Sequence, residues 1–175
     1  HSDVHEMYLR FFYEALQCVR ETCMGDAMQH GIVIDARRTT DRVTRGVCRM
    51  LAGSGYGTLQ EFRLTSGRRV DVMGINDDGE FVIIEVKVSV GDFCGDRKWR
   101  EYLPYCDRFY FAVPEGFPGR LVPGDCGLIV ADGYGGAIRH AATTIAVDGN
   151  RKRRQLVRFA LAASVRLQRL ADPGV

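Results

Sequence analysis

The chain has 175 residues, of which 46% are apolar and 26% are charged, and its formal net charge is +2. This length and composition are typical of one globular domain, and they exclude a disordered, collagen-like or coiled-coil chain. No apolar run approaches the roughly 20 residues that cross a bilayer, so we expect no membrane contact.

The N-terminal part of the sequence predicts two helices separated by a linker. Residues 3–24 carry apolar side chains at helical spacing, residues 25–39 resemble a linker, and residues 40–52 repeat the helical pattern. We therefore divide the chain into an N-terminal helix and linker, residues 1–36, and a main domain, residues 37–175.

Three strand signals follow, and the short sequences between them are typical of turns. The turns are Ser66-Gly67 and Asp77-Asp78-Gly79. Together these signals predict an antiparallel meander of three strands, namely Leu59–Thr65, Arg68–Asn76 and Glu80–Val88.

The second half of the main domain predicts a helix, two strands and a long C-terminal helix. The helix over residues 92–103 should connect parallel strands, because it lies between the third strand signal and the next one. The later strands are Arg108–Val113 and Gly127–Ala131. The C-terminal helix, residues 151–170, should bury the face formed by Leu156, Ala160, Ala163, Leu167 and Leu170. The predicted fold class is therefore α/β, with a mixed central sheet flanked by helices and extra helices at both ends.

Positive charge is concentrated in two helical segments of the chain. Residues 37–49 contain five arginines and one acid, and residues 149–171 contain seven basic residues and no acid. Clustered positive charge suits a polyanion, so nucleic acid is the first candidate partner. The candidate contacts are Arg42, Arg45 and Arg49 in the first segment and Arg154 and Arg158 in the second.

Free thiols and the N-terminal segment favour a reducing cytoplasm. The six cysteines form no CxxC pair, so a structural zinc site is not expected. Residues 1–24 carry Glu6, Glu14 and Glu21 among the apolar positions, unlike a signal or transit peptide. We therefore expect a cytoplasmic protein.

The third strand of the meander carries two charges in an apolar setting. Because side chains alternate along a strand, Glu85 and Lys87 share a face with Phe81 and Ile83. Burying an ionised group among aliphatic side chains costs several kcal/mol unless the group is paired or bound to a metal. These two residues are therefore candidate functional groups.

The hairpin before this strand brings a second carboxylate to the same place. A three-residue loop with glycine in the left-handed conformation fits Asp77-Asp78-Gly79 and pairs Asn76 with Glu80. Counting back sets Asp71 opposite Glu85, with β-carbons roughly 5 Å apart. A divalent cation would turn this repulsion into a ligand set, and oxygen donors suit Mg²⁺ or Mn²⁺. With Lys87 beside the ion, the reaction implied is phosphodiester hydrolysis.

The sequence here resembles a known group of enzymes. Val70-Asp71 followed by Glu85-Val86-Lys87 is similar to the signature of the PD-(D/E)XK nuclease superfamily. The order of helix, three strands, helix and strand also resembles the core of that superfamily. The resemblance implies a restriction-endonuclease-like αβββαβ core, with Asp71 and Glu85 as metal ligands and Lys87 as a catalytic residue.

A closer resemblance covers residues 44–132. The segments Gly67–Met73, Glu85–Lys87, Asp96–Tyr102 and Tyr105–Phe109 are similar to the MmcB family of bacterial DNA repair proteins. This resemblance implies a role in repair, a PD-(D/E)XK-like domain, and a bacterial protein associated with the nucleoid. The DNA implied is single-stranded, branched or damaged.

One ligand of the superfamily pattern is missing. Many relatives have an acid on the first core helix, where this chain has arginines. Glu61 on the first strand is the candidate replacement as a third catalytic carboxylate. A two-residue Ser66-Gly67 turn would, however, set Glu61 opposite Val72 and on the other face of the sheet.

Further candidate contacts to DNA follow the charged strand. Lys98 and Tyr102 lie one helical turn apart with Trp99 on the adjoining face, if residues 92–103 are helical. The indole or phenol is a candidate for stacking on an unpaired base, and core packing is the alternative for both rings. Asp92 and Asp96 are expected to satisfy backbone amides at the helix start.

The sequence leaves three functions open. The first is a magnesium-dependent or manganese-dependent endonuclease acting in DNA repair. The second is a catalytically weak or inactive nuclease fold that binds DNA, a repair-protein partner or a second copy of itself. The third is a metal-dependent hydrolase of another phosphate ester.

Overall fold

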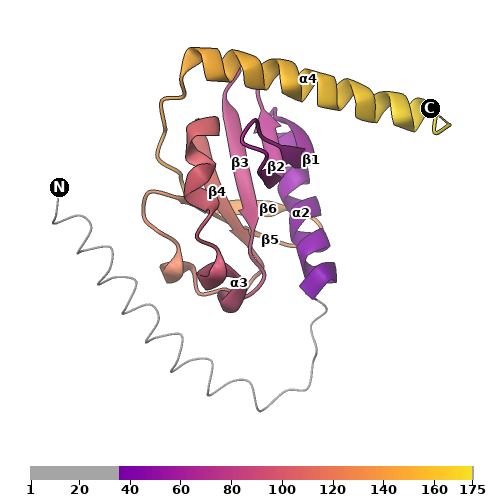
Figure 1. Ribbon diagram of the computed structural model, residues 1–175. Helices are drawn as coiled ribbons and strands as arrows, with labels where there is room; N and C mark the ends of the chain where they lie inside the picture. Colours follow the sequence, from indigo (N-terminus) through magenta and orange to yellow (C-terminus); the bar gives the residue numbers. More distant parts are fainter. Residues whose placement is uncertain (1–35, 175) are drawn as a thin grey trace. The chain divides into compact units, whose positions relative to one another are not determined.

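The computed structural model describes residues 36–174, which form a six-stranded mixed sheet with helices on both faces (Figure 1). The strands lie in chain order across the sheet. They are β1 (Gly57–Arg63), β2 (Arg69–Ile75), β3 (Phe81–Val86), β4 (Arg108–Val113), β5 (Gly127–Ala131) and β6 (Gly136–His140). The helices are α2 (Ala36–Gly53), α3 (Val90–Gly95) and α4 (Gly149–Ala171), with short 3-10 helices η1 (Trp99–Glu101), η2 (Leu103–Tyr105) and η3 (Gly119–Leu121).

The pairing of the strands confirms the predicted architecture. β1, β2 and β3 form an antiparallel meander, and β3, β4 and β5 are parallel. α3, η1 and η2 provide the connection from β3 to β4 that parallel pairing requires. The αβββαβ order and the mixed sheet fit a nuclease-like α/β fold. The predicted helix over residues 3–24 lies outside the described residues.

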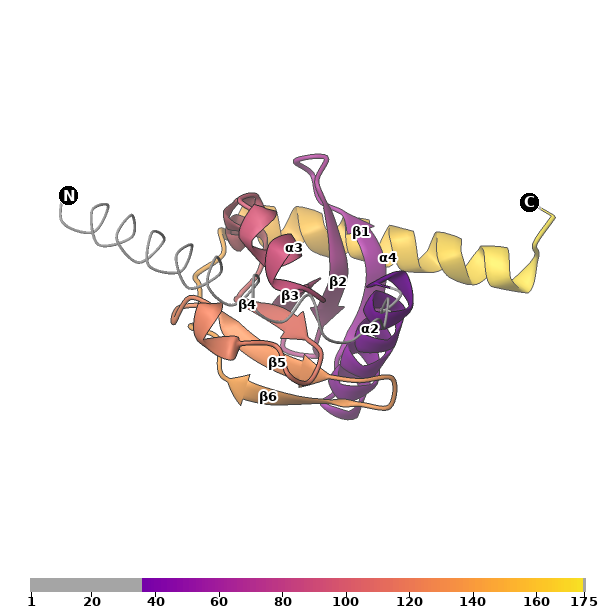
Figure 2. The same ribbon diagram turned by 90° about the horizontal axis from the view of Figure 1, so that it is seen from below.

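The two faces of the sheet carry separate hydrophobic clusters. On one face, α2 lies beside the sheet (Figure 2). Its Val43, Val47 and Leu51 pack against the alternating side chains of the central strands. On the other face, Trp99 and Tyr102 from the β3–β4 connection and Phe159 from α4 cover the sheet. Glu85 and Lys87 are on this second face, because they alternate with the side chains that face α2.

Two elements differ from the sequence prediction. The expected helix over residues 92–103 is broken, because α3 ends at Gly95 and Asp96 takes an extended backbone conformation as its C-cap. β6 was not predicted; it pairs antiparallel with β5, and Ile138 and its neighbours on this edge strand are exposed. A weakly apolar edge strand gives little periodic signal in a sequence.

The predicted buried face of the C-terminal helix is wrong. Ala163 packs against the core, but Leu156, Leu167 and Leu170 are exposed, and the fully buried side chains are Gln155 and Phe159. The reason is that α4 contacts the sheet along one narrow line, where Phe159 packs against Phe62 and Phe81. Polar contacts hold the rest of α4 in place: Lys152 binds Asp107, Gln155 donates to the Tyr105 carbonyl, and Arg158 donates to the Arg63 carbonyl.

None of the helices within residues 36–174 has the combination of length and apolar composition needed to cross a membrane.

Candidate active site

The hairpin between β2 and β3 has the predicted register. Gly79 has φ 71°, and the amide of Asn76 donates to the carbonyl of Glu80 at 3.3 Å. The ladder continues to Val72 opposite Ile84, so the next position sets Asp71 opposite Glu85. Asp71 accepts a hydrogen bond from the backbone amide of Val86 at 2.8 Å. The two carboxylates therefore meet at the end of the paired region.

Glu85 is a buried carboxylate with an unused oxygen. Its residue is 5% exposed, and its Oε1 atom has no hydrogen-bond partner among the described residues. Burial first, and then the charge of Asp71, raise the pKa of Glu85 to about 8, against a smaller opposing effect of Lys87. Burial also raises the pKa of Asp71, although the Val86 amide and Lys87 stabilise its charged form. The charge of Asp71 thus disfavours ionisation of Glu85.

Lys87 is held by a third acid that the sequence did not assign to the site. Its Nζ lies 2.8 Å from Asp96 Oδ2, 3.8 Å from Glu85 Oε2 and 3.9 Å from Asp92 Oδ1. Burial favours the neutral amine, but the hydrogen bond to Asp96 and the surrounding carboxylates outweigh it and raise the pKa of Lys87. The ammonium is therefore charged and fixed at the edge of the carboxylate pair.

Asp96 owes this position to the early end of α3. Its Oδ1 accepts from the amide of Lys98 at 2.8 Å, so it satisfies a backbone amide as the sequence suggested, while Oδ2 reaches Lys87. Burial raises the pKa of Asp96, but the bonds from Lys87 and from Lys98 lower it by more. Asp92 is in the first turn of α3, where Ser89 is the N-cap residue. The contact between Asp96 and Lys87 was not predicted, because the continuous helix expected over residues 92–103 places Asp96 inside the helix and not after its end.

The raised pKa of Glu85 predicts an unusual dependence of stability on pH. The folded protein keeps a proton up to about pH 8 that the unfolded chain releases near its ordinary pKa of 4.5. The resulting contribution to the free energy of unfolding is complete below pH 4.5 and is lost as the pH rises to about 8, at up to about 1.4 kcal/mol per pH unit.

Urea unfolding of the metal-free protein between these pH values measures this loss, with Glu85→Gln as the comparison. Glutamine cannot titrate, so the free energy of unfolding of Glu85→Gln should fall less with rising pH than that of the unchanged protein. If the free energies of unfolding of the two proteins change in parallel with pH, Glu85 has its ordinary pKa in the folded protein.

Glu61 is closer to the site than the sequence predicted. The β1–β2 loop has three residues, Thr65–Gly67, because the amide of Leu64 donates to the carbonyl of Arg68. The predicted two-residue turn is therefore wrong by one position, and Glu61 falls opposite Asp71, between the pairs Gln60↔Val72 and Phe62↔Val70. Glu61 has φ 51°, and Arg69 binds its carboxylate at 2.5 Å. Glu61 thus adds negative potential at Asp71, although its charge is paired.

The donor set fits a hard divalent cation. Two carboxylates face each other, and one buried Glu85 oxygen lacks a partner within the described structure. Residues 36–174 contain no group of three or more histidine, cysteine or acidic side chains arranged for a metal. Asp71 and Glu85 are the two protein groups that would hold the ion.

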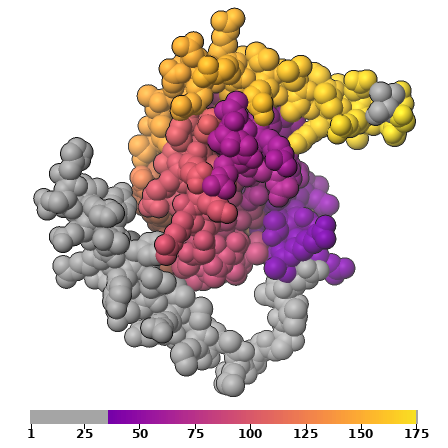
Figure 3. All heavy atoms as spheres, in the orientation of Figure 1, coloured from indigo at the N-terminus to yellow at the C-terminus, as the bar shows by residue number. Residues whose placement is uncertain are grey.

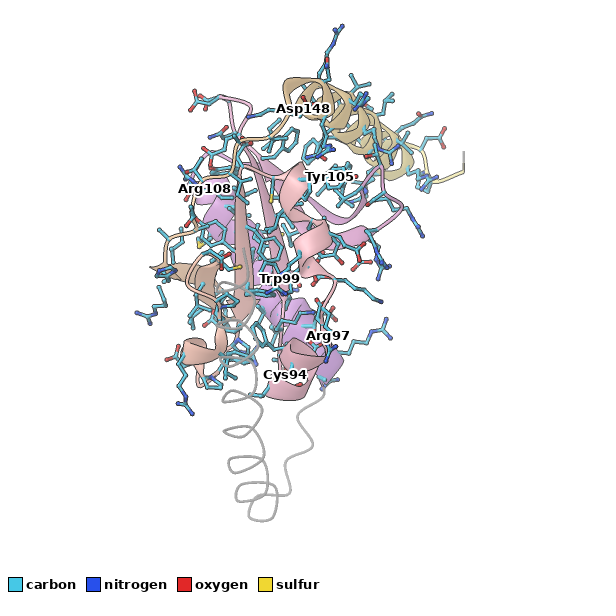
Figure 4. The ribbon with its side chains drawn as sticks, turned by 60° about the vertical axis from the view of Figure 1, so that its left-hand side comes forward. Cys94, Arg97, Trp99, Tyr105, Arg108 and Asp148 are labelled. Atoms are coloured by element: carbon cyan, nitrogen blue, oxygen red, sulfur yellow. The ribbon has the colours of Figure 1, made fainter. Side chains whose placement is uncertain are left out.

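Trp99 and Tyr102 belong to the core and not to an open stacking platform. The Trp99 residue, which is labelled in Figure 4, is 5% exposed. Its ring stacks on Phe109 at 5.5 Å, and the guanidinium of Arg100 lies 4.4 Å from its centroid. Tyr102 is also buried and packs near Phe109. The core alternative is thus the correct one for both rings, because both are buried. Lys98 is exposed and stays a candidate contact.

The two arginine-rich segments lie on different faces of the sheet. Arg42, Arg45 and Arg49 are exposed on α2, which packs on the face opposite Glu85, and Arg49 donates to the Gly133 carbonyl at 3.1 Å. The structure therefore does not bring these arginines to the carboxylate pair. Arg154 and Arg158 are on α4, which covers the same face as Glu85.

Comparison with known proteins gives a family and one structural relative. No curated protein matches the chain. The SPO1766 protein of unknown function from Silicibacter pomeroyi is 41% identical and has a TM-score of 0.74, over 77% of this chain and 92% of that one. The family model for DNA repair protein MmcB-like matches residues 30–174. Since this match covers all of the described residues together with six before them, the chain belongs to the MmcB-like family of DNA repair proteins.

Proposed function

We propose that this DNA repair protein is an endonuclease that uses Mg²⁺ or Mn²⁺ to hydrolyse phosphodiester bonds in DNA. The observation that carries the proposal is the group formed by Asp71, Glu85 and Lys87: two carboxylates that the strand register places opposite each other, and an ammonium 3.8 Å from one of them. Membership of a DNA repair family supports DNA as the substrate. The resemblance to the PD-(D/E)XK signature supports the reaction.

Each side chain has a distinct task in this reaction. Asp71 and Glu85 would hold the ion, which when bound offsets negative charge on the phosphate and lowers the pKa of its water. Lys87 is charged and stabilises the negative charge that develops on the phosphate oxygens, or orients the attacking water. Asp96 positions Lys87 through the 2.8 Å hydrogen bond.

A DNA-binding protein without nuclease activity is the second candidate function. It is favoured by the pairing of Lys87 with Asp96 and by the arginines that stand on α2 where many relatives have an acidic ligand. In this case the basic helices bind DNA, or the fold recruits a repair partner or a second copy. The same residues then contribute charge and structure but no chemistry.

Incubation with labelled DNA decides between the two functions. The full chain is mixed with Mg²⁺ or Mn²⁺ and single-stranded, duplex or branched DNA, beside Lys87→Ala and a matched control, Arg139→Ala. Arg139 is exposed on β6, at the far edge of the sheet. We expect cutting by the unchanged protein and by Arg139→Ala, and a loss of at least about 100-fold in Lys87→Ala. Cutting that Lys87→Ala retains would come from another site, and binding without cutting would favour the second function.

A further inference from the structure

A groove with basic walls lies beside the candidate active site. It runs between the end of β1 and the middle of α4 and has a volume of about 430 Å³. Its lining includes Glu61 and Arg63 from β1 and Arg158, Leu161, Ala162 and Arg166 from α4. We call it the β1–α4 groove. Figure 3 shows the side chains of α4 lying against those of the β1–β2 region on this side of the molecule.

Three arginines give the groove a positive charge, and two of them are already positioned. Arg158 Nη2 donates to the carbonyl of Arg63 at 3.1 Å, and Arg166 Nη2 donates to the carbonyl of Glu61 at 3.4 Å. Each bond uses one nitrogen of a guanidinium that has five N–H donors, so further donors stay available to a ligand. The single acid, Glu61, is paired with Arg69. The ligand that this charge suits is an anion.

The same groove has an apolar wall. Leu161 is 61% exposed, and Ala162 lies next to it on α4. A wall of this kind contacts the flat apolar surface of a nucleobase, while neighbouring guanidinium groups bind phosphate or stack on the base. Bases in a duplex are stacked on their neighbours and do not offer this surface. The combination therefore suits an unpaired strand and not a paired one.

One residue of the groove, Glu61, is a neighbour of the carboxylate pair. Glu61 lines the groove and lies opposite Asp71 in the register of β1 and β2. Neighbouring strands are about 4.8 Å apart, so the groove begins one strand away from the site. A DNA strand with a phosphate at the carboxylate pair can thus continue into the groove.

We propose that the β1–α4 groove binds single-stranded DNA next to the phosphate at the candidate active site, with Arg63, Arg158 and Arg166 on the phosphates and Leu161 against a base. This inference rests on the proposed function for the position of the strand. It assigns the substrate as DNA with an unpaired segment, such as a tail or a gap.

Binding in the absence of metal tests the groove separately from cleavage. Fluorescence anisotropy in a chelator compares tailed DNA with a fully paired duplex of the same length, over about 50 to 200 mM salt. The first variant is Leu161→Glu, and its matched control is Leu167→Glu, an equally exposed leucine on α4 that lies outside the groove. We expect the unchanged protein to bind tailed DNA more tightly than the paired duplex. The affinity for tailed DNA should fall about tenfold in Leu161→Glu and stay the same in Leu167→Glu.

A second pair of variants tests the arginines. Removal of Arg158 and Arg166 together should make the slope of log affinity against log salt shallower by about 1.4, because each phosphate contact on a single strand contributes about 0.7. The control removes Arg153 and Arg169, which are exposed on the same helix outside the groove. Thermal melting checks that all four proteins are folded.

The outcomes separate the groove from the proposed function. If both groove variants bind tailed DNA like their controls while the unchanged protein cleaves DNA, the groove assignment is wrong and the nuclease stands. If the variants lose binding but the unchanged protein never cleaves, the nuclease is wrong and the groove stands. Equal or better binding of paired duplex by the unchanged protein also overturns the groove assignment.

Discussion

Asp71→Asn is expected to abolish DNA cleavage and to raise the melting temperature of the metal-free protein. Asparagine can still accept the hydrogen bond from the Val86 amide, and it removes the repulsion with Glu85. Above about pH 8, where Glu85 is ionised as well, relief of like charges facing each other on a sheet stabilises by up to about 1 kcal/mol. Loss of one of two metal ligands should lower the cleavage rate by at least about 100-fold.

Thermal melting in a chelator above about pH 8 and cleavage of labelled DNA measure the two effects of Asp71→Asn. Asp77→Asn is the matched control, because Asp77 is exposed in the turn of the same hairpin. It should change neither quantity. A lower melting temperature in Asp71→Asn would mean that Asp71 and Glu85 do not repel each other.

Asp96→Ala should destabilise the folded protein by about 3 to 5 kcal/mol. The change leaves the buried ammonium of Lys87 without its nearest partner, and the side chains of the pair are only 8% and 13% exposed. Urea unfolding at neutral pH measures the loss. The contribution of the 2.8 Å bond exceeds that of the 3.9 Å contact with Asp92, which is about half exposed.

Asp92→Ala is the comparison for this prediction. It also removes one carboxylate near the Lys87 ammonium, but it should lower the free energy of unfolding by less than about 1 kcal/mol. An equal cost for the two variants would show that Lys87 is not fixed mainly by Asp96, and the positioning role would then be wrong.

The central hairpin could be predicted from the sequence because two local signals agree. The loop Asp77-Asp78-Gly79 fixes the register, and the alternation along Phe81–Val86 fixes the face. When both signals are present, the partner of a residue on the neighbouring strand can be predicted, as for Asp71 and Glu85. The β1–β2 loop gave a weaker signal, since Ser66-Gly67 also fits a loop of three residues, and the position of Glu61 was wrong for that reason.

The surroundings of the hairpin depend on long-range contacts that no sequence window contains. α3 ends at Gly95, and Asp96 then reaches Lys87, a partner on another element. The face of α4 is chosen by Phe159, which packs between Phe62 and Phe81 of distant strands. Amphipathic periodicity ranked Leu156 and Leu167 above Gln155, because it counts apolar residues and cannot include the hydrogen bond to the Tyr105 carbonyl.

Calorimetric titration of the full chain with Mn²⁺ is the most direct test of a metal site at Asp71 and Glu85. Glu85 has a pKa of about 8, so an ion that binds there at neutral pH must displace a proton, and the measured heat should change with the ionisation enthalpy of the buffer. We expect binding with proton release by the unchanged protein, and neither in Glu85→Gln. Absence of binding by the unchanged protein, or identical binding by Glu85→Gln, would contradict the account.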